Sequence, residues 1–125
     1  MVQHVILERK AVFLGGLGKM ILKELYEIIN ERKSRGEEGS YTKYLFKKGT
    51  DKILKKVGEE CTEVVIAAKG DNKEELINEI CDLSYHILVL MADKNIDIKE
   101  VENELITRRD KINNFKGERK EIKEI

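Results

Sequence analysis

The chain has 125 residues, the size of one domain, and its 24 basic side chains balance its 24 acidic ones. This neutral charge gives no argument for nucleic acid or an anionic membrane as a partner, and no apolar run is long enough to span a bilayer. With 38% charged residues, abundant Glu, Lys, Leu and Ile and no proline, the composition favours helices. We interpret the two cysteines, Cys61 and Cys81, as free thiols in the core of a cytoplasmic protein.

Residues 1–19 are apolar and glycine-bearing and do not fit the pattern that follows them. Gly15 and Gly16 are encoded by GGNGGN, which can act as a ribosome-binding sequence shortly before the codon of Met20. We therefore expect residues 1–19 to be a leader or a non-native extension, with Met20 as the natural start.

Apolar residues recur at helical spacing from Met20 to about Lys33, which predicts a first helix. The loop 34–39 follows it. Ser40 is suited to cap a short helix over residues 41–47, and Gly49 to end it.

A long helix is predicted from Thr50 or Asp51 to about residue 69, where Gly70 stops it. Asp71 and Glu74 have the spacing of a capping box, and they predict the start of the next helix, which ends near residue 93.

Asp97 and Glu100 repeat the capping-box spacing before a last helix that ends near residue 112. Residues 113–125 form a charged tail. The expected fold over residues 20–112 is an all-α bundle of four to five helices. The second long helix has an apolar arc too wide for one short chain to cover, which predicts that a homodimer completes the bundle.

Two acidic pairs, each spaced i, i+3, stand out on the long helices. On a helical wheel Glu60 and Glu63 flank an apolar stripe, and Lys52 and Lys56 lie on the same flank. The stripe consists of Ile53, Val57, Cys61, Val64 and Ala68.

On the next helix, Glu79, Asp82 and His86 lie together on a flank beside the apolar arc. If the two helices are antiparallel neighbours, four carboxylates converge. Two such charges about 4 Å apart repel by about 4 kcal/mol at an effective dielectric of about 20. A divalent cation removes that cost, and hard oxygen ligands suit Mg²⁺. Acidic pairs are also common on solvated helix faces, so this pattern alone leaves a non-catalytic helical dimer open.

Gly58 is a further irregularity inside the first of these long helices. A glycine there costs about 1 kcal/mol relative to alanine. Either another helix or a substrate approaches the backbone at this point, or the glycine is a tolerated imperfection. Lys52 and Lys56 are placed to contact phosphate oxygens.

The acidic motif, Glu59-Glu60-x-x-Glu63 followed by Glu79-x-x-Asp82, resembles the signature of the all-α nucleotide pyrophosphatases, the MazG-like superfamily. Further segments narrow the resemblance to the phosphoribosyl-ATP pyrophosphatases of histidine biosynthesis. These segments are Ser40-Tyr41-Thr42-x-x-Leu45, Gly49-x-x-Lys52-x-x-Lys55-Lys56-x-Gly58 and Asp82-Leu83-x-Tyr85-His86.

The resemblance implies a homodimeric, Mg²⁺-dependent hydrolase that cleaves phosphoribosyl-ATP between its α and β phosphates. By motif match, Glu60, Glu63, Glu79 and Asp82 are expected to be metal ligands, and Glu59 an acid that assists nearby. Glu59, Glu60 and Glu63 are thus the expected catalytic residues. A housecleaning pyrophosphatase acting on nucleoside triphosphates is the alternative within the superfamily.

Three further residues are candidate substrate contacts beside the two lysines. Tyr41 and Thr42 offer hydroxyl groups, although Tyr41 could equally cap or pack. His86 could bind substrate or act as a base, or serve as a structural hydrogen-bond partner. Tyr85 is expected to pack in the dimer interface.

Overall fold

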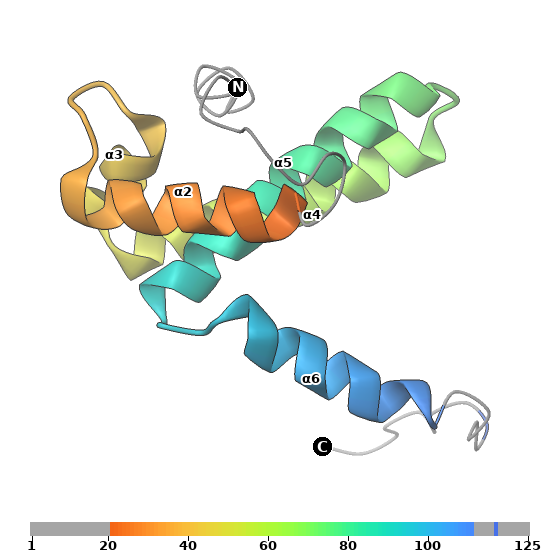
Figure 1. Cartoon of the computed structure of the whole chain (residues 1–125). Helices are drawn as coiled ribbons and strands as arrows, with labels where there is room; N and C mark the ends of the chain where they lie inside the picture. Colours follow the sequence, from red (N-terminus) through yellow and green to blue (C-terminus); the bar gives the residue numbers. More distant parts are fainter. Residues whose placement is uncertain (1–20, 112–116, 118–125) are drawn as a thin grey trace, which may run out of the picture.

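The computed structural model describes residues 21–111 and residue 117, and within this part of the chain it contains helices and no strand. The expected leader, and the tail apart from Gly117, lie outside the described residues. The all-α fold class is confirmed. No described helix is both long enough and apolar enough to cross a membrane. The helices are α2 (Ile21–Arg35), α3 (Tyr41–Lys48), α4 (Thr50–Lys69), α5 (Lys73–Asp93) and α6 (Ile98–Arg109) (Figure 1).

Local signals set most of the helix boundaries. The Ser40 side chain accepts a hydrogen bond from the backbone N–H of Lys43 and caps α3. Gly49 ends α3 and begins α4 with a φ of 95°, a conformation that a residue with a Cβ adopts only under strain. The capping box of Asp97 and Glu100 is present at the start of α6.

Two predicted boundaries are wrong. Asn72, not Asp71, caps α5, and its side chain accepts from the backbone N–H of Glu75. Asn and Asp are equally favourable N-cap residues, so residue type does not distinguish Asp71 from Asn72. The helix begins one residue later than predicted, and this places the side chain of Asn72 at the free backbone N–H groups of the first turn. The last helix ends at Arg109 and not near residue 112.

The α4 and α5 helices pack side by side, and the short connection between them makes them antiparallel (Figure 1). The α2 helix crosses α5, and α3 packs against both α2 and α4. The α6 helix points away from these four and buries none of its residues. The core lies where α2, α3, α4 and α5 meet, around Ile29, Leu45, Ile53, Tyr85 and Val89.

The rotation of α4 differs from the expected one. Ile53, Glu60 and Ala67, seven residues apart, are its buried positions. Cys61 and Cys81 are exposed free thiols, so their prediction as core residues is wrong. Ile53 keeps its expected place, whereas Glu60 and Ala67 are buried in place of Cys61 and Ala68, which brings an acid into the line that faces α5.

Tyr85 was expected in a dimer interface and instead lies in the core of the chain, 1% exposed. Its hydroxyl is 2.5 Å from Oγ1 of Thr42, a buried contact between residues 43 positions apart. The pair connects α3 to α5 with each polar atom satisfied, as buried hydroxyls require.

This pair gives a stability prediction. Replacing Thr42 by valine leaves the Tyr85 hydroxyl buried without its partner, and we expect a loss of about 1–3 kcal/mol in the free energy of unfolding, measured by urea denaturation. The double variant T42V/Y85F removes both polar atoms and should lose less than T42V alone. Wild-type stability in T42V would show that the contact contributes nothing.

Candidate active site

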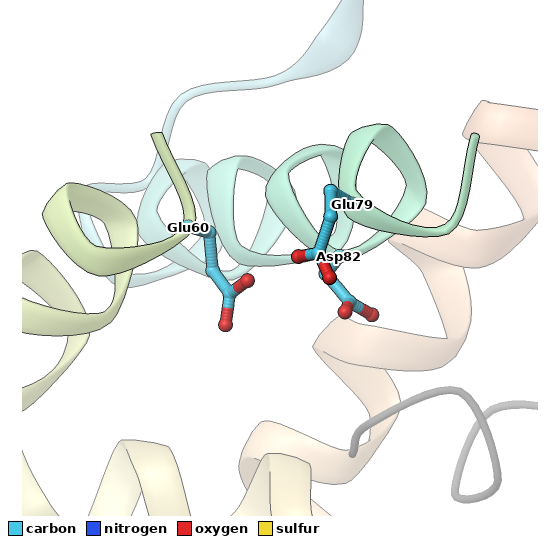
Figure 2. A group of neighbouring side chains, drawn as sticks. All are labelled: Glu60, Glu79 and Asp82. Atoms are coloured by element: carbon cyan, nitrogen blue, oxygen red, sulfur yellow. The ribbon is translucent and has the colours of Figure 1, made fainter. Parts of the chain in front are cut away.

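The α4 and α5 helices bring three carboxyl groups together (Figure 2). One oxygen atom of each of Glu60, Glu79 and Asp82 lies within 4.8 Å of the corresponding atoms of the other two. Glu60 comes from the face of α4 toward α5, and the other two come from successive turns of α5. The expected convergence of acids from both helices is therefore present for these three.

Each of the three acids leaves one buried oxygen atom without a partner in the described part of the chain. Glu60 is 6% exposed and Asp82 is 2% exposed. Oε2 of Glu60, Oε2 of Glu79 and Oδ1 of Asp82 are buried and have no hydrogen-bond partner among the described residues. Each such orphaned oxygen is costly, and a hard divalent cation is the group that would satisfy several of them at once. The donor set fits a cation.

The acids also hold protons more tightly than isolated carboxyl groups do. Burial raises the pKa of Glu60 from 4.5 to about 7. The hydrogen bond with Glu63 raises the pKa of Glu79 to about 7, and burial raises the pKa of Asp82. Hydrogen bonds from Glu79 and Glu60 lower the pKa of Glu63. Without a cation, protons partly neutralise the cluster.

Glu63 and Glu59 lie at the edge of the cluster. Glu63 is exposed, lies within hydrogen-bonding reach of Glu60 and Glu79, and is not one of the three converging ligands. Glu59 is exposed and points its carboxylate to Lys56, with Oε1 at 3.2 Å from Nζ. The acidic motif therefore divides into three converging members, of which Glu60 and Asp82 are buried and Glu79 is half-buried, and two exposed members at the edge.

Only one of the two predicted lysines reaches the acids. Nζ of Lys56 lies 3.6 Å from Oε1 of Glu60, in addition to its ion pair with Glu59. Lys52, one turn earlier on α4, forms no ion pair with the acids that the structure describes.

His86 is not on an open flank but is fully buried, which corrects its expected place. Nδ1 lies 2.7 Å from the backbone oxygen of Asp82, and Nε2 lies 3.1 Å from the hydroxyl of Tyr41. Burial lowers the pKa of His86, which favours the neutral ring. Nδ1–H then donates to Asp82, and Nε2 accepts from Tyr41. The ring holds the Asp82 turn and has no free nitrogen for substrate.

The hydroxyl groups of Tyr41 and Thr42 on α3 also form hydrogen bonds with residues of α5. Thr42 is 1% exposed and bonded to Tyr85, so it offers no surface to a nucleotide in this structure. Tyr41 is half-buried, and its ring also contacts Tyr44, with centroids 6.0 Å apart. The sequence does not predict that these residues bond to α5, because contacts across 40 or more positions leave no local pattern.

Gly58 does not mark a close approach within the described chain. A Cβ built there meets no atom within 4 Å, and the residue is exposed. The approach of another described helix is excluded, which leaves the approach of a substrate, the approach of a helix from a second copy, or a tolerated imperfection.

The fold and the site define an all-α protein with a buried carboxylate cluster fitted to a divalent cation. Comparison with known families shows which one this is. The sequence model described as phosphoribosyl-ATP pyrophosphohydrolase matches residues 22–109, and the chain belongs to this family. The resemblance found in the motifs is confirmed.

Individual relatives agree with the family match. The phosphoribosyl-ATP pyrophosphatase of Clostridium acetobutylicum is 61% identical over 105 residues, which cover 84% of this chain and 96% of that protein. The phosphoribosyl-ATP pyrophosphatase of Listeria innocua serovar 6a is 57% identical over 105 residues, covering 84% of this chain and all of that protein. The phosphoribosyl-ATP pyrophosphatase of Bacillus cytotoxicus is 57% identical over 102 residues, which cover 82% of this chain and 94% of that protein.

The raised pKa values predict how stability depends on pH. Because folding raises the pKa of Glu60 and Glu79 from 4.5 to about 7, the folded state binds more protons than the unfolded state between these pH values. In chelator, the free energy of unfolding should therefore fall as pH rises from about 4.5 through about 7. Urea denaturation from pH 5 to pH 8 measures this.

Glu79→Gln should flatten that pH profile, because it removes one of the two acids with a raised pKa. Glu104→Gln is the matched control on α6, where Glu104 pairs only with Arg108 among the described residues. A wild-type profile that rises between pH 5 and pH 7 would contradict the assignment.

Proposed function

We propose that the protein hydrolyses phosphoribosyl-ATP to phosphoribosyl-AMP and pyrophosphate, the second step of histidine biosynthesis. The observation behind this proposal is the cluster of Glu60, Glu79 and Asp82 with its three orphaned oxygen atoms. Family membership and the names of the relatives support the choice of substrate. Such a cytoplasmic role agrees with the free thiols of Cys61 and Cys81.

We infer Mg²⁺ as the cation, with Glu60, Glu79 and Asp82 as ligands and Glu63 as a further ligand from the edge. All their donors are hard carboxylate oxygens, the type that Mg²⁺ prefers. Mg²⁺ would neutralise charge on the phosphate oxygens and bring them to the acids, which would otherwise repel them.

The chain's own side chains have separate tasks in this proposal. Lys56 contacts phosphate oxygens, and Glu59 orients its ammonium group. Glu63 is exposed at the edge of the cluster, so it is placed to accept the proton of an attacking water. Tyr41 and His86 act as positioning residues that fix the Asp82 turn. Lys52 remains a candidate phosphate contact.

A homodimer follows from exposed apolar surface. Leu22, Ile66, Ile77, Ile80 and Leu105 are all more than two-fifths exposed in the single chain. An apolar groove of about 610 Å³ also lies between α2, α5 and α6. Soluble monomers rarely leave such surface uncovered, and we infer that a second copy covers it.

A single assay tests the function and its alternatives. Mg²⁺-dependent pyrophosphate release is measured with phosphoribosyl-ATP and with a panel of nucleoside triphosphates. We expect the highest kcat/KM with phosphoribosyl-ATP. A preference for a triphosphate would favour the housecleaning alternative. No turnover of any of them would favour a non-catalytic dimer.

Glu60→Gln should lower kcat by about two orders of magnitude or more, because it removes a buried charge from the cation site. The helical circular dichroism should stay unchanged, since Gln has the shape of Glu. In chelator the variant should unfold at higher urea concentration than wild type above pH 7, because one buried carboxylate is gone. Near-normal turnover would refute the role of Glu60, and Glu104→Gln again serves as the control.

A further inference from the structure

A second groove, of about 470 Å³, lies between α3 and the loop before it. Lys43 and Lys47 line it together with Tyr41 and Tyr44, and Glu38 lines it from the loop. Both lysines are exposed, and neither forms an ion pair with a described residue. The groove is separate from the apolar one between α2, α5 and α6.

The charge of α3 is not balanced within the helix. Lys43 and Lys47 are four positions apart and therefore lie on one face, where two like charges are slightly destabilising. The helix has a third lysine, Lys48, and no acid. On α6, by contrast, an acid at this spacing offsets a basic residue, where Glu104 pairs with Arg108. The arrangement on α3 favours an anion in the groove.

The groove adjoins the acidic cluster through Tyr41. This residue lines the groove, and its hydroxyl bonds to Nε2 of His86. Its phenol is also close enough to Lys56 and Glu60 for their charges to act on its pKa, although burial has the largest effect and raises it. One molecule with anionic groups at two ends could therefore reach the cation site and the α3 groove together.

We propose that the α3 groove binds the phosphate monoester of the phosphoribosyl group, with Lys43 and Lys47 as the phosphate contacts. This inference rests on the proposed function. Phosphoribosyl-ATP has a triphosphate at one end and a phosphate monoester at the other, whereas a nucleoside triphosphate has only the first. Ammonium groups are suited to a monoester, and the Glu38 carboxylate can accept hydrogen bonds from ribose hydroxyls. The groove would then select phosphoribosyl-ATP over ATP.

The kinetic test compares K43A and K47A with K48A. The Lys48 ammonium lies over the Tyr44 ring and does not line the groove, so K48A removes the same charge from the same helix without removing a proposed contact. We expect kcat/KM for phosphoribosyl-ATP to fall about 10- to 100-fold in K43A and K47A, the usual effect of losing a charge-assisted hydrogen bond. K48A should change it much less. Equal losses in all three variants would overturn the inference.

A binding test separates this inference from the proposed function. Ribose 5-phosphate is titrated into the ¹⁵N-labelled wild-type protein in chelator, with ribose as the matched probe that lacks the phosphate. We expect shifts of amide resonances centred on residues 39–47 that ribose does not cause, and their loss in the double variant K43A/K47A but not in K48A. Shifts centred elsewhere, shifts that survive the double variant, or no shifts would overturn the groove assignment.

The two possible failures give different results. If wild type does not hydrolyse phosphoribosyl-ATP but ribose 5-phosphate still binds through Lys43 and Lys47, the proposed function fails and the phosphate-monoester site stands. If wild type hydrolyses phosphoribosyl-ATP and K43A and K47A behave like K48A, the function stands and the groove assignment fails.

Discussion

Three carboxyl groups that the fold brings together, those of Glu60 and Asp82 buried and that of Glu79 half-buried, constrain the site and the helices around it. Glu60, Glu79 and Asp82 each leave an oxygen atom without a hydrogen-bond partner among the described residues, and Lys56 pairs with only one of the three. Desolvation and mutual repulsion make this part of the chain a source of instability in the absence of a cation. Contacts with the neighbouring helices must therefore hold the three carboxyl groups in place.

Hydrogen bonds between α3 and α5 hold the turn that contains Asp82 in place. His86 holds the turn of Asp82 and is itself held by Tyr41 from α3, while Thr42 on the same helix bonds to Tyr85. The short α3 helix thus forms hydrogen bonds with two successive residues of α5, Tyr85 and His86, one turn after Asp82. Buried or half-buried polar pairs of this kind specify one arrangement of the helices, whereas apolar contacts alone would tolerate small rotations.

The helices and the existence of an acidic site could be predicted from sequence because their signals are local. Ser40, Gly49 and the Asp97 capping box act within four residues, and acids at i, i+3 lie on one face of any helix. A helical wheel orders the residues on one helix, but it does not say which side the neighbouring helix covers. That is why Cys61 was expected inside, and why the burial of His86 was not predicted.

The neutral net charge of the chain also hides a separation of charge that only the packed structure reveals. Acids gather between α4 and α5, while α3 has three lysines and no acid, and Tyr41 stands between the two regions. In sequence the acids of the cluster are interspersed among other charges, whereas the lysines of α3 stand in a stretch without acids, and the two sets cancel only in the total. In space they form two regions of opposite charge that Tyr41 connects, and a cation in the acidic region would make both regions favourable for anionic groups. On the proposed assignment of the α3 groove, the protein would discriminate by the presence of a second, separate phosphate group, which a nucleoside triphosphate lacks.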